Sequence, residues 1–173
     1  LPWHPSPEAH RFLAGFAKPR GIVAEKIAGM LCHPVMGPIL LPLLVREPSR
    51  RASIEAVLRN TATATSLGSG GNINVLPGVA SVDIDGRLAP GQTTDDLLGE
   101  LEVVLSPLLG NDYALSVLQE SPAVSFETNT ELFREIERSL AEADPDCHVV
   151  PAIIPGFTDS RNYAPLGAHC YGF

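Results

Sequence analysis

The sequence predicts an α+β fold. A two-layer, ferredoxin-like βαββαβ domain is expected over residues 1–119, followed over residues 120–173 by a strand-helix-strand piece of an α/β domain. Two observations support this expectation. An alternating strand hairpin pattern at 60–86 is followed by an amphipathic helical pattern, and a second strand-helix-strand alternation begins at residue 149.

Residues 1–48 are rich in proline and glycine and carry short apolar clusters, which predicts short helices joined by proline turns. The most apolar stretch, residues 27–45, is interrupted by prolines, whereas a membrane-spanning helix needs about 20 nearly uninterrupted apolar residues. A further helix is expected to follow with Ser49 as its cap. Its buried stripe would consist of Ile54, Val57 and Leu58.

The hairpin pattern starts at Asn60, after which threonines alternate with alanines. Gly68-Ser69-Gly70-Gly71 breaks the pattern, and residues 73–76 are expected to begin a return strand that alternates up to residue 86. We therefore expect a hairpin with one buried face. A hairpin turn is strongly favoured over a phosphate-binding loop, because neither Gly-Lys-Ser/Thr nor a helix follows the glycines.

The helix after the hairpin is predicted by a capping box, in which Thr93 and Asp96 satisfy each other's backbone N–H groups. Leucines and valines at helical spacing continue this pattern to Leu108, and residues 113–118 alternate like a strand. Pro122 is expected to mark a boundary.

The second part of the chain is predicted to start with an amphipathic helix from about Thr130, which ends before Pro145. Residues 149–154 form an apolar strand pattern, and residues 169–173 start another. Between them lie a loop and a short helix, so the order suggests the edge of a parallel sheet.

Composition narrows the function classes. The chain has 173 residues, of which 45% are hydrophobic, and its net charge is −8. Residues 1–60 are basic and residues 61–173 strongly acidic, so we expect no nucleic-acid partner and interpret the acidic half as a solvated surface. Three scattered cysteines fit no disulfide framework, which favours a reducing, cytoplasmic location. A start at Leu1, without methionine, suggests an internal piece of a longer protein.

Three motifs occur in a specific order. Asn60-Thr61 and Asn74-Val75-Leu76-Pro77 precede Arg87, which lies within Asp85-Gly86-Arg87-Leu88-Ala89-Pro90-Gly91. Gly156-Phe157-Thr158-Asp159-Ser160-Arg161 follows, and Tyr171-Gly172-Phe173 comes after it. In this order the motifs resemble those of the M20 zinc metallopeptidase family, from about residue 50 to the end of the chain.

The resemblance implies a zinc-dependent amidohydrolase or exopeptidase that cuts an amide bond near a free carboxylate. Residues 1–119 would be its lid (dimerisation) domain with a helical extension, and residues 120–173 a returning segment of the catalytic domain. It further implies two zinc ions and a general-base glutamate outside this chain, and therefore neither catalytic nor metal-binding residues within it. The implied partners are a peptide or N-acyl amino acid and a second subunit, with no membrane partner. The alternative is a non-catalytic βαββαβ ligand-binding or dimerisation module.

Five residues are candidates for substrate binding. Arg87 would fork onto the substrate carboxylate, or else lie on the solvent side of an edge strand. Asn74 would contact the substrate as donor and acceptor, or else hold the turn before the following proline. Gly156, Thr158 and Asp159 would line the active-site wall, and Thr158 or Asp159 could at the same time cap the next helix.

Phe157 stands where M20 family members often have glycine, which predicts a narrower or more apolar pocket. The histidines lack acidic partners at ligand spacing and are interpreted as surface or packing residues. They are His4, His10, His33, His148 and His169.

Overall fold

The computed structural model describes residues 1–121, 123–154, 156 and 158–172. The expected boundary at Pro122 and the expected pocket wall at Phe157 therefore lie outside the described residues, as does Phe173.

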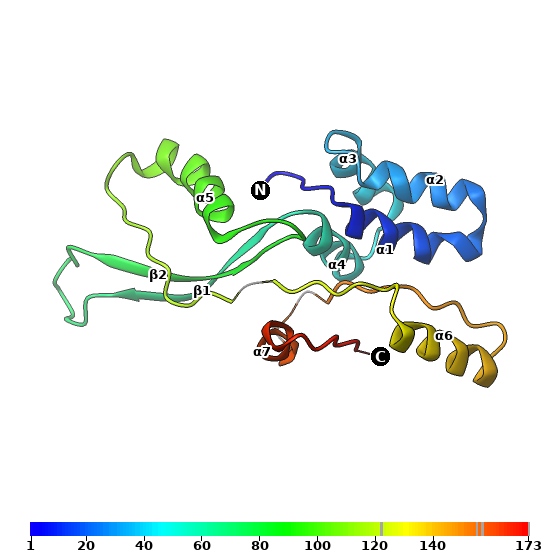
Figure 1. Ribbon diagram of the computed structural model, residues 1–173. Coiled ribbons are helices and arrows are strands. Elements are labelled where there is room, and N and C mark those ends of the chain that lie inside the picture. The colour runs from blue at the N-terminus through cyan, green and yellow to red at the C-terminus, as the bar shows by residue number, and fades with distance from the viewer. Residues whose placement is uncertain (122, 155, 157, 173) are drawn as a thin grey trace.

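In chain order the elements (Figure 1) are α1 (Pro7–Ala17), the 3-10 helix η1 (Lys18–Arg20), α2 (Ile22–Leu31), α3 (Met36–Leu44), α4 (Pro48–Leu58), β1 (Thr61–Ser69), β2 (Ala80–Arg87), α5 (Thr94–Leu109), α6 (Glu131–Ala143), α7 (Ser160–Tyr163) and the 3-10 helix η2 (Ala164–Leu166). Helices with one antiparallel sheet confirm the α+β class. The ferredoxin-like arrangement is not confirmed, because the described residues form two strands rather than four.

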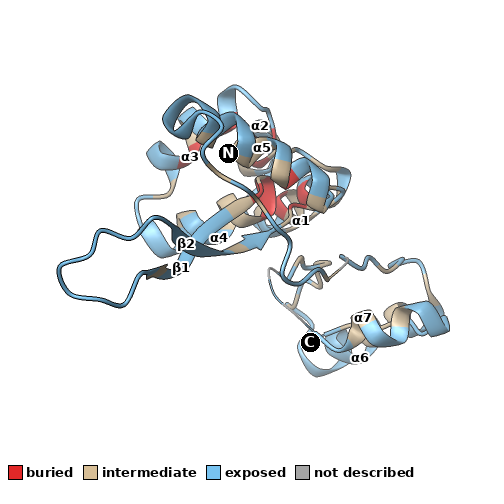
Figure 2. Ribbon diagram, turned by 90° about the vertical axis from the view of Figure 1, so that its left-hand side faces the viewer, coloured by how far each residue is buried: buried red, intermediate tan, exposed pale blue. Residues whose placement is uncertain are grey.

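Helices α1 to α4 form the compact part of the chain, as the proline-punctuated pattern predicts, and Figure 2 shows that most of the buried residues lie here. Ser6 caps α1 by accepting a hydrogen bond from the Ala9 backbone N–H at 3.0 Å, and Pro7 takes the first helical position. The buried side chains that pack together are Trp3, Ala9, Leu13, Ala28, Leu31, Cys32, Leu41, Val57 and Leu58. Burial of this set supplies the hydrophobic stabilisation of the helical part.

Helix α4 differs from its prediction at the start. Its N-cap residue is Glu47, and Ser49 instead donates a side-chain hydrogen bond to Glu47 Oε1 at 2.9 Å. The reason is Pro48, whose fixed φ and missing N–H suit the first helical position, so the helix begins two residues earlier than it would with Ser49 as its cap.

Close packing at Gly37 joins the start of the chain to α3. The Trp3 indole Nε1 donates a buried hydrogen bond to the Leu31 carbonyl at 2.8 Å. A methyl group at Gly37 would lie 2.2 Å from that carbonyl oxygen and 2.6 Å from the indole nitrogen, so only glycine fits. The neighbouring Cys32 is also buried, and this burial raises the pKa of its thiol.

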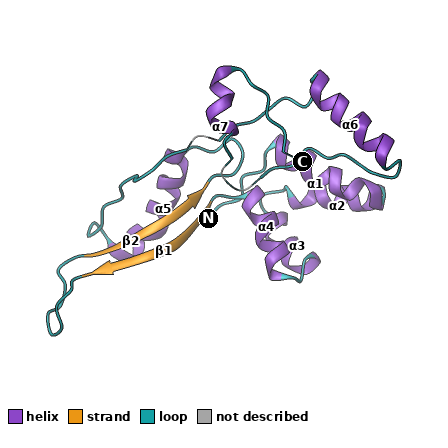
Figure 3. Cartoon of the chain, turned by 90° about the horizontal axis from the view of Figure 1, so that it is seen from below, coloured by secondary structure: helices purple, strands orange, loops and turns teal. Residues whose placement is uncertain are grey.

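The hairpin of β1 and β2 projects away from the helical part, as Figures 1 and 3 both show. The strands are antiparallel, with Thr61 opposite Arg87 at the base. The expected buried face is wrong: Val82 and Ile84 remain 48% and 39% exposed. Helix α5 packs against the base of the hairpin, where Leu97 occupies the space that a side chain at Gly86 would fill.

The return strand begins later than predicted. Residues 73–76 lie in the connection between the strands, and β2 starts at Ala80. Pro77 explains this delay, because it has no N–H to donate to a ladder.

Helix α5 has the capping box that the sequence predicts. Thr93 Oγ1 accepts from the Asp96 backbone N–H at 3.2 Å, and Asp96 Oδ2 accepts from the Thr93 backbone N–H at 2.8 Å. The Thr93 hydroxyl also donates to Asp96, and these hydrogen bonds hold the pKa of the Asp96 carboxyl below its usual value. Of the apolar stripe on α5, Leu97 is buried and Leu108 is exposed.

The C-terminal part has the predicted helices but not the predicted strands. Thr130 caps α6 by accepting from the Phe133 N–H at 3.1 Å, and the helix ends at Ala143, before Pro145. Residues 113–118, 149–154 and 169–172 are extended or irregular rather than strands. A strand is stable only in a hydrogen-bonded ladder, and the one sheet among the described residues is that of β1 and β2, so none of these segments takes part in a ladder.

Aromatic contacts hold the end of the chain to α6. The Phe133 and Tyr171 rings meet edge to face with centroids 5.3 Å apart, and the Tyr171 hydroxyl is hydrogen-bonded to Thr130 Oγ1 at 2.8 Å. In the described part of the chain, none of the helices combines the length and the apolar character needed to cross a bilayer.

Candidate functional site

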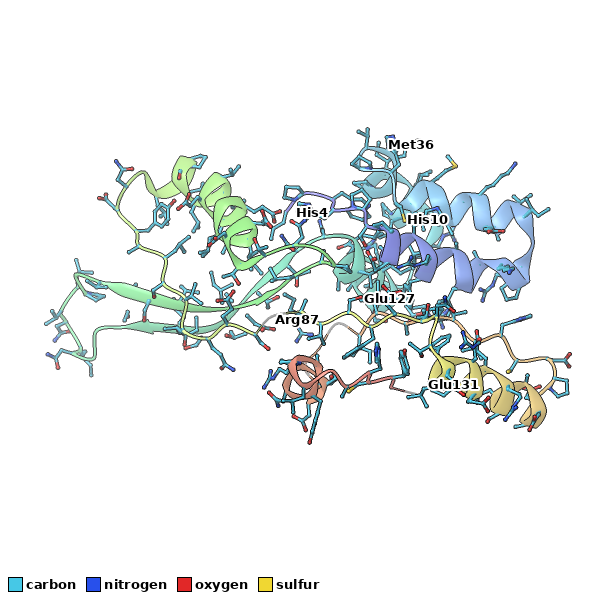
Figure 4. The ribbon with its side chains drawn as sticks, viewed as in Figure 1. His4, His10, Met36, Arg87, Glu127 and Glu131 are labelled. Carbon is cyan, nitrogen blue, oxygen red and sulfur yellow. The ribbon has the colours of Figure 1, made fainter. Side chains whose placement is uncertain are left out.

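Arg87 is the last residue of β2, and its side chain is 52% exposed. Its Nε donates to Asp85 Oδ2 at 3.1 Å, a contact between side chains two residues apart on the same face of the strand. Figures 1 and 3 show that the base of the hairpin is the end nearer to α7, and Figure 4 shows Arg87 at this base. Because half of the side chain is exposed, a small substrate could reach it.

The backbone around Arg87 is fixed by a buried polar cluster that sequence reasoning missed. Asn60 accepts a hydrogen bond from the Ala89 backbone N–H at 2.9 Å and donates one to Glu100 Oε1 at 3.2 Å. Glu100 Oε1 also contacts His4 Nε2. His4 therefore has a partner that is 96 residues away, which no local pattern can indicate. His4 was interpreted as a surface or packing residue, and in the structure it binds the side chain of Glu100.

Asn74 lies at the opposite end of the hairpin, within the connection between β1 and β2. Among the described residues it is the one non-glycine residue with a positive φ, at 75°. Asparagine tolerates this left-handed conformation better than most residues, so the predicted turn role is present in the structure. The residues of β2 alone separate the tip from Arg87 by about 23 Å at the rise of a β-strand, so one chain does not bring Asn74 and Arg87 together.

The loop before α7 contains the other three predicted residues. Gly156 and Thr158 are exposed, and the Thr158 hydroxyl is hydrogen-bonded to that of Ser160. Asp159 occupies the N-cap position of α7 without a side-chain capping bond, and its carbonyl accepts from the Asn162 N–H at 2.9 Å. Asp159 thus leads directly into a short helix, but neither Thr158 nor Asp159 caps that helix with its side chain as the turn interpretation predicts.

A shallow hollow of about 300 Å³ lies next to this turn. Arg161 crosses it and donates to Ser121 Oγ at 3.1 Å. The residues that line it are Gln119, Glu120, Ser121, Arg161 and Asn162. Arginine, amide and hydroxyl groups make it polar, so the hollow suits a polar group of a ligand better than an apolar chain.

Metal chemistry has no site among these residues. Within the described ranges, no three His, Cys, Asp or Glu side chains are gathered so that they could hold a metal ion. His33 has a structural role instead, since its Nδ1 accepts from the backbone N–H groups of Val35 and Met36, each at 3.2 Å.

The amino-acid sequence of the chain is similar to that of a known protein family. The peptidase dimerisation domain family (M20_dimer) matches residues 4–112. "Probable carboxypeptidase S-like 2" of Dictyostelium discoideum is 27% identical over 136 residues, which cover 76% of this chain and 25% of that protein. "N-fatty-acyl-amino acid synthase/hydrolase PM20D1.1" of Danio rerio is 30% identical over 118 residues, 68% of this chain and 23% of that protein.

A mouse relative extends the similarity further along the chain. "N-fatty-acyl-amino acid synthase/hydrolase PM20D1" of Mus musculus is 29% identical over 165 residues, 91% of this chain and 30% of that protein. The chain thus spans between 23% and 30% of the length of these relatives. No solved structure matches it significantly. Because the family match covers more than half of the chain, including Asn74 and Arg87, the chain belongs to the peptidase dimerisation domain family of the M20 peptidases.

Proposed function

We propose that the whole protein containing this chain is a zinc-dependent amidohydrolase or exopeptidase that hydrolyses an amide bond beside a free carboxylate. The names of the relatives support this substrate class. A carboxypeptidase and a hydrolase of N-acyl amino acids both cleave an amide bond next to a free carboxylate. A peptide or an N-acyl amino acid is therefore the substrate, and this chain contributes recognition and dimerisation.

The observation that carries the proposal is the position of Arg87 within the family match. A guanidinium offers parallel N–H groups in a planar fork, and this geometry matches the two oxygens of a carboxylate. Asp85 orients the group through Nε, and the half-exposed side chain lies at the hairpin base near α7. Gly156, Thr158 and Asp159 would then form part of the wall that faces the substrate.

The zinc ions of this proposal would be held by residues outside this chain. The role proposed for this chain is to bind the substrate through hydrogen bonds and charge. Arg87 would bind and orient the carboxylate end, which fixes the position of the amide bond relative to the rest of the active site.

The test is the whole protein with Arg87→Ala, assayed on an N-acyl amino acid and on the same compound with its carboxylate converted to a carboxamide. Loss of a charge-assisted, forked contact should lower kcat/KM for the acid roughly 100-fold. The carboxamide should be hydrolysed almost as before. Arg11→Ala is the matched control, because Arg11 makes an exposed ion pair with Glu8, also at 3.1 Å, far from the hairpin. An unchanged preference for the acid in Arg87→Ala would refute the carboxylate role.

Dimerisation is the second part of the proposal, and the hairpin supports it. Arg87 and Asn74 lie at opposite ends of the hairpin, so both can contact one small substrate only if two chains contribute. We assign Arg87 to the active site of its own chain and Asn74 to that of a second copy. Exposed apolar side chains on β2 and α5 provide surface for this copy, among them Val82, Ile84, Val103 and Val104.

Mixing two inactive variants tests this assignment. In a mixed dimer of Arg87→Ala and Asn74→Ala chains, one active site has both residues intact and the other has neither. Random mixing of subunits should therefore restore roughly a quarter of the wild-type activity in a two-fold dimer. If both residues served the same chain's site, the mixture would remain as inactive as its two components.

A further inference from the structure

Asn60 is a buried amide at a junction of three elements. It follows α4 and precedes β1, and it is 1% exposed, the one polar residue in the described part of the chain that is classed with the core. Burying an amide is unfavourable unless its donor and acceptor are both hydrogen-bonded. Here the Oδ1 atom accepts from the Ala89 N–H at 2.9 Å and the Nδ2 atom donates to Glu100 Oε1 at 3.2 Å.

The bond to Ala89 continues the sheet beyond its last pair. The ladder ends where Thr61 faces Arg87, and it cannot extend much further because the chain before Asn60 belongs to α4, which ends at Leu58. The Asn60 side chain takes over the hydrogen bond that another strand residue would otherwise make. It thereby fixes the backbone two residues after Arg87, at Ala89, which is fully buried.

The bond to Glu100 connects the same point to α5. Glu100 lies in the second turn of that helix and is bonded through Oε1 to both Asn60 and His4. Its other oxygen, Oε2, is buried without a hydrogen-bond partner among the described residues, so the carboxylate depends on the contacts at Oε1. Asn60 therefore joins α5 and the end of β2 into one unit.

From this geometry we infer that Asn60 is a positioning residue for Arg87. It holds the backbone that carries the guanidinium, and through this backbone it sets where the substrate carboxylate binds. The inference rests on the proposed function of Arg87. Displacement of a binding group by about 1 Å can lower the rate 100-fold, so a buried anchor two residues away is close enough to matter.

The test is Asn60→Asp in the whole protein. Aspartate has nearly the same shape and keeps an acceptor for the Ala89 N–H, but it replaces the donor to Glu100 by a negatively charged oxygen. We expect kcat/KM for the N-acyl amino acid to fall roughly tenfold, mainly through KM, with kcat/KM for its carboxamide changed about twofold at most. The ratio of the two kcat/KM values is independent of how much of the sample is folded, so a purely structural role would leave it unchanged.

Rescue uses Asn60→Asp combined with Glu100→Gln. The introduced glutamine amide can donate to the introduced carboxylate, so the hydrogen bond returns with its direction reversed and the selectivity ratio should recover to near the wild-type value. Asn111→Asp, the same substitution at an exposed position just after α5, is the control and should leave the ratio unchanged. Should Asn60→Asp give no folded protein, Asn60→Ser removes both side-chain contacts without adding a charge and should lower the ratio in the same way.

The outcomes separate this inference from the proposed function. If Arg87→Ala lowers the preference for the acid while both Asn60 variants retain it, Asn60 does not position Arg87 and the carboxylate role stands. Failure of the double variant to restore the ratio likewise overturns the inference. If Arg87→Ala itself retains the preference for the acid, the proposed carboxylate role of Arg87 is wrong, and the positioning role of Asn60 is wrong with it.

Discussion

Replacement of Gly37 by alanine should destabilise the helical part of the chain by about 3 kcal/mol. The added methyl group would lie 2.2 Å from the Leu31 carbonyl oxygen and 2.6 Å from Trp3 Nε1, which are the two ends of a buried hydrogen bond. Overpacking of this kind costs about 2 kcal/mol, and separating the buried donor from its acceptor costs about 2 more. The higher helix propensity of alanine returns at most about 1 kcal/mol, because Gly37 lies in α3.

Urea unfolding measures this change directly, because Trp3 is the single tryptophan of the sequence and belongs to the affected contact. With an m-value of about 2 kcal/mol/M, the midpoint should fall by roughly 1.5 M. Gly99→Ala is the matched control: Gly99 lies in α5, and a methyl group there would meet no atom within 4 Å. Relief of the helix penalty should make this variant neutral or more stable by about 1 kcal/mol. A Gly37→Ala midpoint at or above that of the wild type would refute the packing argument.

Three further predictions concern the start of α5 and the buried Cys32 thiol. Thr93→Ala should weaken the start of α5 by about 1 kcal/mol, visible as faster amide hydrogen exchange in its first turn. The Asp96 pKa lies below its ordinary value of 3.8, so its carboxylate stabilises the fold above about pH 4 and this contribution is lost as the pH falls through the folded-state pKa. Asp96→Asn should abolish that pH dependence of exchange. The raised pKa of Cys32 keeps its thiol protonated, so iodoacetamide should modify it more slowly than Cys147 or Cys170 at pH 8, and urea should remove the difference. Equal native rates for the three thiols would contradict this.

Local signals in the sequence predicted local structure well. The capping box at Thr93 requires only a residue three positions away and is present, and the helix expected from about Thr130 begins at Glu131 with Thr130 as its cap. The proline-rich pattern likewise predicted short helices in residues 1–48, although Pro42 lies inside α3 and not in a turn between helices. Ser49 was wrong as a cap for an equally local reason, since Pro48 competes for the first helical position.

The strand predictions at 113–118 and 149–154 were wrong because a strand forms only when it is hydrogen-bonded to a neighbouring strand. Alternation of apolar residues indicates which side chains would share a face, but it does not supply the neighbouring strand. The hairpin of β1 and β2 formed because its partner is the adjacent segment. By the same reasoning, a partner strand from another part of the protein or from a second copy could order the other segments.

At the candidate site, the sequence likewise indicated the residue that lies in a local motif but not the contacts between residues far apart in the chain. Arg87 could be selected from its motif and lies at an accessible strand end. The Asn60 amide and Glu100 carboxylate that hold this strand end are 40 residues apart, and His4 is still further away. Only the Asn-Thr pair of the family motif marked this location in the sequence, without indicating that the asparagine side chain is buried.

The hairpin also gives a physical reason why dimerisation and substrate recognition would be coupled in this protein. Its length sets the distance between Arg87 at the base and Asn74 at the tip, so in a two-fold dimer it also sets where the tip of one chain meets the site of the other. Deleting two residues from each strand would preserve which face every side chain occupies, because the side-chain period of a strand is two. It would nevertheless move Asn74 by about 7 Å relative to Arg87. On the proposed function, such a shortened hairpin should still bind the carboxylate through Arg87 and lose the contribution of Asn74. The length of the hairpin, and not only the identity of its residues, is then part of the recognition of substrate.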